Sequence, residues 1–395
     1  MHHFQKNYFG KLAGVRMLLS AVCALLLSAP SHSQSALEYK QGEVKVTLNG
    51  YADFGYAVGP QRQHQYLDYI SGDSLNDFGR RDFTSYPLYV NQFSLSMAYL
   101  QAQMAYGDKF RFRFAVHAGH IPDALYFAEH PSLRKVREAA VLYRLNERWS
   151  VEAGIFPSYF GSEVPLNKEN LHATRGYIAD FAPDYESGLR LAYSRNPAHT
   201  FTLMLLNGWQ EIRDANGKKA LALSYAINKP GKITGNWNVY LGDERALGAQ
   251  NSQWRMYHNV YARVFVGEKW LFLPAIDWVI QEKSGPQKCL GADGYQQVLG
   301  LAFSARYALH KHHGIAVRYD HVHNPQDIVE ELRTNSPSGW RSGSGTLTYE
   351  FVPIPQFTWR VEGRYGLNKD AVFRNANNGA TRADWYAITT AAFHF

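Results

Sequence analysis

The chain has 395 residues, 14% of which are aromatic, and a formal net charge of +7. Without the first 35 residues, which hold three basic and no acidic side chains, the charge is 38 minus 34, or +4. Such a weak charge gives no reason to expect a nucleic-acid partner. Of the two cysteines, Cys289 alone lies beyond this segment, which excludes a disulfide-rich fold and a cysteine-based metal site.

The N-terminal segment is typical of a secretory signal peptide. Basic residues precede the apolar run "MLLSAVCALLLSA" (residues 17–29), and small residues suited to cleavage follow it. The run is about seven residues short of the roughly 20 that a membrane-spanning helix needs, and no later stretch approaches about 18 consecutive apolar residues. We therefore predict a cleaved signal peptide over residues 1–35 and a single domain over residues 36–395.

Apolar and polar residues alternate with a period of two along much of the remaining chain. In "FRFRFAVHA" (110–118) the phenylalanines share one face, while Arg111 and Arg113 share the other. The segments "VKVTLNGYADFGY" (44–56) and "FTWRVEGRYG" (357–366) show the same pattern. About sixteen segments have roughly the 9 to 14 residues with which a tilted strand crosses a membrane. They begin near Val44, Leu88, Lys109, Val136, Trp149, Glu186, Thr200, Lys218, Lys232, Trp254, Lys269, Tyr295, His312, Gly345, Gln356 and Ala383.

The connections between these segments are of two kinds. Short turns alternate with longer links, at residues 59–86, 119–135, 157–184, 210–217, 243–253, 282–294, 324–344 and 367–382. A soluble β-sandwich also has alternating faces, but it has no reason to sort its loops in this way. The sequence therefore predicts an all-β fold. We expect a transmembrane antiparallel up-and-down β-barrel of about 16 strands in the lipid of the bacterial outer membrane, with short periplasmic turns and long extracellular loops.

The polar face of the predicted strands is assigned to the lumen, because an Arg or Lys that faces the middle of the bilayer costs about 2 to 4 kcal/mol. On this face bases outnumber acids, although Asp277, Asp320 and Glu350 also lie there. The predicted pore-lining residues are Lys45, Asp53, Arg111, Arg113, Glu138, Arg144, Glu152, Arg190, Arg255, Arg263, Arg306, Arg318, Arg360, Glu362 and Arg364.

A barrel of this strand number leaves room for water inside. We expect an outer-membrane porin that gives passive diffusion to small polar solutes or ions, with a mild preference for anions. In the alternative interpretation, the arginines and acids pair across strands and only keep the wall hydrated. A non-conducting structural or adhesion barrel, or a barrel enzyme, stays open as an alternative function.

The link over residues 157–184, "PSYFGSEVPLNKENLHATRGYIADFAPD", is among the longest, and loops of this length are usually functional or mobile. It has two interpretations. As an external loop, it would lie over the mouth of the barrel. If it folded inward, it would narrow the pore with the charges of Glu163, Lys168, Glu169, Arg175 and Asp180.

Three motifs resemble a known family. They are "GIFPSYFGSE" (154–163), "PDYESGLRLAYS" (183–194) and "LLNGWQEIRDANGKK" (205–219). They are similar to the putative outer-membrane beta-barrel porin family of Gram-negative bacteria labelled porin-2 or OmpL-like, over about residues 44–245. The resemblance implies an outer-membrane pore and transfers no catalytic residue. Within the third motif, Trp209 suits the outer aromatic girdle, and Asn216 with Gly217 suits a tight turn.

No spaced motif supports catalysis, a cofactor or a metal site, so we predict that the protein is not an enzyme. His321 and His323 share a strand face, but it is the face assigned to lipid. The segment "WLFLPAIDWVI" (270–280) is apolar on both faces. It predicts a bulge or a subunit contact, which leaves a homo-oligomer open.

The chain ends in the strand-like segment "DWYAITTAAFHF". This last strand must pair with the first one, because an open edge cannot remain in lipid. Phe393 and Phe395 lie on one face and fit the C-terminal aromatic signal of outer-membrane barrels. We therefore predict them to be the assembly signal, with the barrel-assembly machinery as a partner.

Overall fold

The computed structural model describes residues 37–60, 84, 86–87, 89–245, 251–283, 294–328, 334, 336–377 and 379–395, and the backbone of 63–67 and 74–78. The predicted signal peptide over residues 1–35 lies outside this part of the chain. So do residues 284–293, which include Cys289.

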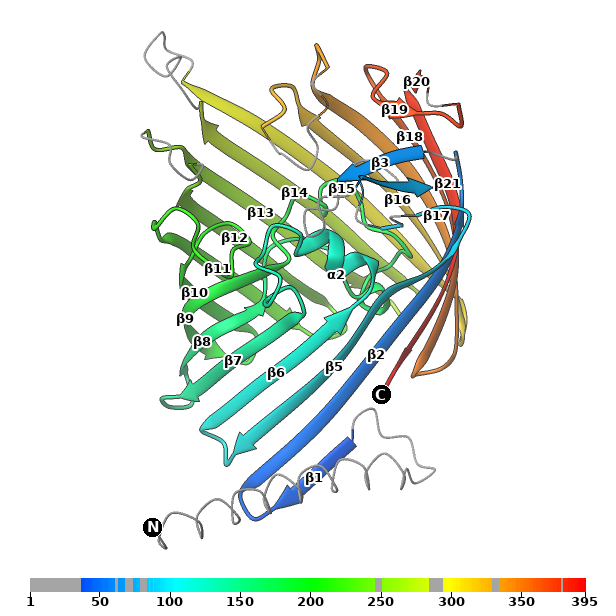
Figure 1. Cartoon of the computed structure of the whole chain (residues 1–395). Coiled ribbons are helices and arrows are strands. Elements are labelled where there is room, and N and C mark those ends of the chain that lie inside the picture. The colour runs from blue at the N-terminus through cyan, green and yellow to red at the C-terminus, as the bar shows by residue number, and fades with distance from the viewer. Residues whose placement is uncertain are drawn as a thin grey trace, which may run out of the picture.

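The described residues form a closed antiparallel barrel of 16 strands (Figure 1). Each strand pairs with the next along the chain, and the last pairs with the first. The barrel strands are β2 (Val44–Val58), β5 (Phe93–Tyr106), β6 (Phe110–Ala118), β7 (Val136–Arg144), β8 (Trp149–Pro157), β9 (Tyr185–Asn196), β10 (His199–Leu206), β11 (Ala220–Lys229), β12 (Ile233–Asp243), β13 (Trp254–Val266), β14 (Trp270–Glu282), β15 (Tyr295–His310), β16 (His313–Asn324), β17 (Trp340–Ile354), β18 (Phe357–Asn368) and β21 (Ala383–His394).

The predicted fold, strand number and alternation of short and long connections are confirmed. Two predicted strand starts were five residues off. β5 begins at Phe93 instead of Leu88, because Asn91 has a φ of 60°, a left-handed conformation that does not fit a strand. β17 begins at Trp340 instead of Gly345, because Ser342 and Ser344 continue the strand and make hydrogen bonds from its inner face.

Smaller elements lie at the ends of the barrel and within it (Figure 1). β1 (Leu37–Gln41) pairs with the start of β2 near the chain's C-terminus, at the rim with the short turns. The long links carry the two-stranded pairs β3 (Gln63–Leu67) with β4 (Ser74–Phe78) and β19 (Phe373–Arg374) with β20 (Ala380–Thr381). They also carry the helix α2 (His120–Leu125) and the 3-10 helix η1 (Asn167–Glu169). No helix among the described residues has both the length and the apolar character to cross a membrane.

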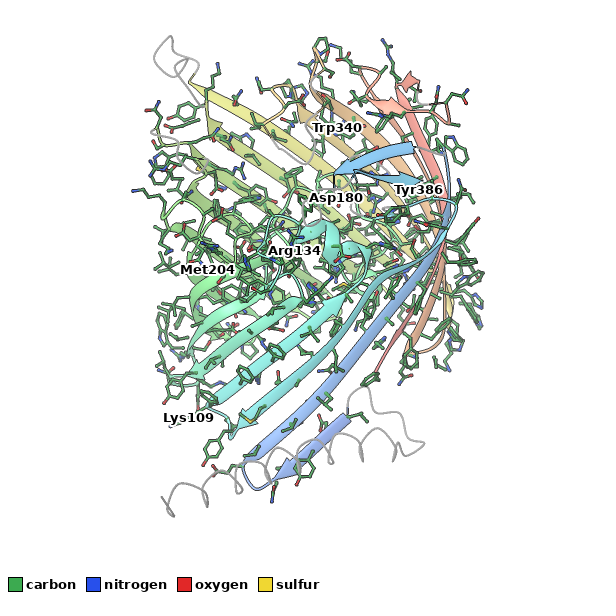
Figure 2. The ribbon with its side chains drawn as sticks, viewed as in Figure 1. Lys109, Arg134, Asp180, Met204, Trp340 and Tyr386 are labelled. Atoms are coloured by element: carbon green, nitrogen blue, oxygen red, sulfur yellow. The ribbon has the colours of Figure 1, made fainter. Side chains whose placement is uncertain are left out.

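The alternation of the sequence places apolar side chains outside and polar ones inside. On β18, Trp359, Val361 and Tyr365 are exposed on the outer surface, while Arg360 and Glu362 are buried within the barrel. Figure 2 shows side chains over the outer surface, with Lys109 at the lower rim and Asp180 higher in the view. The outer surface therefore suits lipid, and the charged side chains stay away from it.

Residues 157–184, here called the inner loop, fold into the barrel. Most of their side chains are buried, and their aromatic residues pack on inward-facing wall residues such as Tyr257 and Trp340. Gly300 on β15 permits this close approach, because a Cβ atom there would lie 2.5 Å from Cγ2 of Ile178. Of the two predicted conformations of this loop, the structure has the inward one.

The inner loop also explains why β14 is apolar on both faces. Its inward-facing Leu273 packs against Leu171 of the loop, while Ile276 and Trp278 are exposed outside. Pairing with β15 continues through Pro274 without a change of register. The expected bulge is therefore absent from β14. The second apolar face belongs to a contact inside the barrel.

Candidate functional site

The main chain of the inner loop is bonded to the barrel wall, chiefly by side chains of β16 and β18. Further bonds come from Asn238 of β12, which donates to the Tyr159 carbonyl oxygen, and from Asn259 of β13, which accepts from the Gly161 N–H.

Arg360 of β18 donates to the carbonyl oxygens of Asn167 (2.6 Å), Asn170 (2.8 Å) and His172 (3.2 Å). Its guanidinium group also pairs with Glu350 at 2.7 Å, and Glu350 pairs with Arg306. One buried arginine thus satisfies three loop carbonyl groups.

Two more arginines act in the same way. Arg318 of β16 donates to the carbonyl oxygen of Thr174 at 2.8 Å and pairs with Glu163 at 2.7 Å. Arg364 donates to the carbonyl oxygen of Arg175 at 2.7 Å. Its guanidinium carbon lies 4.1 Å from the ring centroid of Tyr177. Charge-assisted bonds of this kind are the strong ones, particularly away from water.

Acids of the same wall accept from the loop's N–H groups. Glu362 accepts from the Ala173 N–H at 2.6 Å, and Asp320 accepts from the Tyr177 N–H at 2.9 Å. The wall therefore supplies both donors and acceptors to one stretch of loop backbone. We call the inner faces of β16, β17, β18 and β21 the clamped wall.

His172 lies at the centre of this attachment. Its side chain is fully buried, and Nδ1 is 2.7 Å from the hydroxyl oxygen of Thr348. Burial holds the pKa of His172 well below its usual range, and the charges of Arg318, Arg360 and Arg364 act in the same direction. His172 is therefore neutral at neutral pH and adds no charge to the three arginines.

The motif that includes Trp209 joins the loops above the lumen. Trp209 packs edge-on against Tyr240 and Tyr257, both at 5.0 Å between ring centroids, and these two tyrosines face inward. The expected position of Trp209 in the outer girdle is therefore wrong. The expected tight turn is present: Gly217 has a φ of 72°, and Asp214 accepts a hydrogen bond of 2.6 Å from the Gly217 N–H.

A buried carboxylate completes this junction. Glu129, in the link between β6 and β7, accepts from the Tyr185 hydroxyl at 2.9 Å and from the Ile212 N–H at 2.7 Å. Gln210 accepts from the Asp184 N–H at 2.7 Å. Three consecutive long links thus meet at one point, which fixes the end of the inner loop.

Among the described residues, no side chain of β5, β6 or β7 bonds to the inner loop's main chain, and we call the inner faces of these three strands the free wall. Here charged side chains pair with one another. Arg113 pairs with Glu138 at 2.7 Å and also contacts Glu152, and Arg190 donates to Glu152 at 2.6 Å. The alternative interpretation, cross-strand pairing, is thus correct for these four side chains.

A cavity of about 260 Å³ lies between the free wall and the inner loop. From the wall it is lined by Tyr99, Gln101, Arg137 and Glu138. From the loop it is lined by Pro157, Ser158, Phe160, Glu163, Val164, Pro165, Leu166, Glu169, Pro183 and Asp184. It combines charged, amide and apolar surfaces.

Arg137 is a lining residue that the alternation did not predict. Ala115 pairs with Glu138, and the next residue, Val116, pairs with Val136, so Arg137 is the extra residue of a β-bulge. A bulge re-aims one side chain and breaks the period of two. Arg137 therefore points inward beside Glu138 and lies over the ring of Tyr99.

The predicted pore-lining residues fall into three groups. The inner loop covers Arg318, Arg360, Glu362 and Arg364, which are at most 5% exposed, and Asp53 is buried among Tyr51 and Tyr86. Glu138, Glu152 and Arg190, on β7, β8 and β9, are buried in the cross-strand ion pairs that include Arg113. The partly or fully exposed residues are Lys45, Arg111, Arg113, Arg144, Arg255, Arg263 and Arg306.

The five charged residues predicted to narrow the pore also differ in exposure. Glu163 and Arg175 are buried, and the Asp180 side chain is 5% exposed at 3.9 Å from Arg175. Lys168 is half-buried, and Glu169 is exposed. Only the last two therefore present much charge to the lumen.

The C-terminus closes the barrel beside Gly50. Phe395 and Gly50 exchange two main-chain hydrogen bonds of 3.1 Å. The ring of Phe395 covers Gly50 so closely that a Cβ atom there would lie 2.2 Å from Cε1. Phe393 is exposed on the outer surface. An aromatic ring over a strand glycine replaces the packing that the missing side chain cannot give.

A family model described as "Putative beta-barrel porin-2, OmpL-like" matches residues 45–395. The chain belongs to this family. The match reaches the C-terminus, so the resemblance carried by the three motifs extends over the whole barrel. The protein is a porin of the bacterial outer membrane, and family and fold fit a channel better than an enzyme. A comparison with curated protein sequences found no match.

Solved structures share the fold at low sequence identity. The anion-selective porin from Comamonas acidovorans has a TM-score of 0.56 and 13% identity, covering 89% of this chain and 100% of that one. OmpT of Vibrio cholerae has a TM-score of 0.55 and 11% identity, covering 91% and 100%. OmpF of Salmonella typhi, in a complex with daunomycin, has a TM-score of 0.54 and 12% identity, covering 91% and 100%.

Proposed function

We propose that this porin lets small polar solutes and ions diffuse passively through the cavity between the inner loop and the free wall. The observation that carries the proposal is the cavity itself, with its volume of about 260 Å³ and the polar side chains of Gln101, Arg137 and Glu169 in its lining. A lining that can hydrogen-bond replaces part of a solute's hydration shell. Such transport needs no catalytic residue and no cofactor, and we propose neither.

The inner loop is the constriction in this proposal. Lys168 and Glu169 bring charge to the passage, while Glu163, Arg175 and Asp180 hold the shape of the loop. The clamped wall fixes the loop's position by bonds to its backbone. The width of the passage is therefore set mainly by the clamp.

A mild preference for anions stays a prediction. We now assign it to arginines at the periplasmic end of the barrel. Arg111 and Arg144 lie at the short-turn ends of β6 and β7, and neither has an ion pair among the described residues. Lys45 pairs with Glu38 at 2.8 Å, with both side chains about half exposed. Two arginines without an ion pair raise the local concentration of anions at the periplasmic mouth of the barrel.

Recordings in a planar bilayer test the proposal directly. The purified, folded porin should give stepwise channels, and in a salt gradient the reversal potential should lie modestly toward that of the anion. A folded barrel without conductance would contradict the proposed function. Channels that prefer cations would contradict the anion preference alone.

The C-terminal strand is proposed as the contact with the barrel-assembly machinery. Deleting Phe395 removes the ring that covers Gly50 and two main-chain hydrogen bonds, so the amount of folded protein in the outer membrane should fall strongly. The conductance of the barrels that do assemble should be normal. Heat-modifiable migration of membrane extracts measures the folded fraction, and an unchanged fraction would contradict the proposal.

We also propose a homo-oligomer. Its support is the fold it shares with an OmpT structure of Vibrio cholerae described as a trimer form, with a TM-score of 0.51 and 11% identity. Light scattering of the detergent-solubilised porin measures the mass of the complex. A mass equal to one chain would contradict this part of the proposal.

A further inference from the structure

A depression of about 510 Å³ lies over the paired strands β17 and β18. Beside it stand the side chains of Leu347 and Tyr365, which are 58% and 52% exposed. Arg318 and Arg364, which belong to the same lining, face the interior of the barrel and are at most 5% exposed. The open side of the depression is therefore the outer surface of the barrel, where lipid lies. We call it the outer depression.

Two glycines form the floor of the outer depression. Gly345 of β17 pairs with Tyr365 of β18, and Gly363 of β18 pairs with Leu347 of β17. A Cβ atom built on either glycine would meet no other atom within 4 Å. Apolar atoms beside a gap lose their van der Waals contacts, so filling this space is favourable. An acyl chain of the bilayer is the apolar group that can do so.

A basic cluster, consisting of Arg341, His321 and His323, lies on the same outer face. Trp340, the neighbour of Arg341, is fully buried inside the barrel, so Arg341 points outward by the alternation of a strand. Arg341 pairs with His323, and His321 pairs with Gly343, two residues further along β17. Residues directly opposite each other in a sheet share a face, so both histidines point outward as well.

The basic cluster lies toward the extracellular end of the outer depression. Figure 2 labels Trp340 high in the barrel and Lys109, next to a short turn, at the lower rim. Arg341 precedes Gly345 on β17 by four residues, which is about 13 Å along a strand. An acyl chain covers such a distance. A lipid whose headgroup meets the basic cluster can therefore place a chain in the outer depression.

The basic cluster has unused hydrogen-bonding capacity. The Nε atom of Arg341 is buried and has no hydrogen-bond partner among the described residues. In the same part of the chain, neither Arg341 nor the two histidines form an ion pair. The cost of an arginine on a lipid-facing surface is smallest near the headgroups. There a guanidinium group binds phosphate bidentately, and an imidazole donates an N–H to phosphate whether it is charged or neutral.

We propose that the basic cluster and the outer depression together bind a phosphorylated glycolipid of the outer leaflet, of the chemical class of lipid A. One phosphate would accept hydrogen bonds from the basic cluster, and one acyl chain would occupy the outer depression. A glycolipid is the occupant because the cluster lies at the extracellular end, where glycolipids carry the phosphate groups of the leaflet. The site faces the bilayer, so this inference does not depend on the proposed diffusion function.

Native mass spectrometry of the purified, folded porin in detergent tests the proposal, because it measures how much of each lipid stays bound. The probes are bisphosphorylated lipid A, its dephosphorylated form, and phosphatidylglycerol as an anionic phospholipid. Bisphosphorylated lipid A should bind more tightly than either of the other two. Heat-modifiable migration and channel conductance, measured in parallel, show that each variant is folded.

The first pair of variants tests the phosphate contact. Arg341→Gln should weaken binding of bisphosphorylated lipid A about fivefold, because each basic side chain near a charged headgroup contributes a factor of this size. Binding of the dephosphorylated form should stay the same. Lys218→Gln is the matched control, since it removes one exposed positive charge just before β11, at the same rim but away from the site. It should leave binding of both forms unchanged.

The second pair tests the acyl-chain contact. Gly345→Leu with Gly363→Leu fills the outer depression, and the open space over both glycines accommodates the new side chains. This variant should weaken binding of both forms of lipid A to the same extent, because it affects the chain and not the phosphate. Ala153→Leu adds the same side chain to the exposed outer face of β8 and should leave binding unchanged.

Each part of the proposal has its own contradicting result. Equal affinity for bisphosphorylated and dephosphorylated lipid A would overturn the role of the basic cluster. Phosphatidylglycerol bound as tightly as lipid A would overturn the choice of a glycolipid. Unchanged binding in the double leucine variant would overturn the role of the outer depression, and equal losses in the control variants would overturn the site as a whole. None of these results bears on the proposed function, which conductance tests separately.

Discussion

Two strands of the barrel carry nearly the same sequence pattern and have different roles. In β6, Arg111 and Arg113 alternate with phenylalanines, and in β18, Arg360 and Arg364 alternate with apolar residues. The inner loop covers the arginines of β18, so that they bind its backbone, while the Arg113 side chain is 20% exposed on the free wall. The same alternation thus supplies a clamp on one wall and a lumen surface on the other.

This difference shows that facing the interior is not enough to make a residue line a pore. The strand pattern decides which face of the sheet a side chain occupies. The position of a loop, far away in the sequence, decides whether that side chain meets water. The two walls can therefore be separated by experiments that treat equivalent arginines in parallel.

Replacement of the clamp arginine should have the largest effect. Arg360→Ala removes bonds to three loop carbonyl groups and one partner of Glu350. Breaking a buried charged network costs about 3 to 5 kcal/mol, so the inner loop should leave the clamped wall. We expect severalfold larger single-channel conductance and tryptic cleavage after Lys168 and Arg175, both measurable on the folded porin.

Arg111→Ala is the matched control for this experiment, since it removes the same side chain from the equivalent pattern on β6. It should leave the inner loop protected from trypsin and lower only the preference for anions. If Arg360→Ala gave a protected loop and normal conductance, or if both variants released the loop, the distinction between the two walls would be wrong.

Replacement of Trp209 should have an intermediate and local effect. Its ring packs on Tyr240 and Tyr257 above the loop. Trp209→Ala should therefore lower the stability of this region by about 2 kcal/mol, through the loss of apolar burial. Hydrogen exchange should become faster in residues 158–166 and stay slow in residues 167–177, which the clamp holds. Exchange that rises equally along the whole loop would mean that the clamp does not anchor it independently.

The pH dependence of the preference for anions should be the smallest effect. It tests a charge at the mouth of the barrel, on neither of the two walls. Burial raises the pKa of Glu211, in the link after β10, to about 7. Glu211 is therefore neutral below this pH and negative above it, so the preference for anions should fall slightly from pH 6 to pH 8. Reversal potentials should show the shift, and Glu211→Gln should remove it. An identical shift in that variant would assign the titration to another group.

The barrel itself could be predicted from the sequence because its determinants are local. Each barrel strand must present apolar side chains on the face that meets lipid, and the connections at the periplasmic rim are short. This fixed the strand number and most strand starts. The errors at β5 and β17 arose where a left-handed residue, Asn91, and a run of serines and glycines departed from the pattern.

The site could be predicted only in part. The clamp acts on carbonyl and N–H groups of the loop, which every residue possesses, so the loop's own sequence contains no matching pattern. One signal was present: the second apolar face of β14, which indicates a partner inside the barrel. Arg137 was missed because a bulge changes the face of one residue without changing the residues around it.

Thiol accessibility tests most directly whether solutes pass along the free wall. In a Cys289→Ser background, Gln101→Cys places a thiol in the cavity lining, and Thr348→Cys places a matched thiol on the clamped wall, where Thr348 is 1% exposed. During bilayer recording, a small methanethiosulfonate reagent should reduce the conductance of the Gln101 variant and leave the Thr348 variant unchanged. A block at Thr348 with no effect at Gln101 would contradict the account.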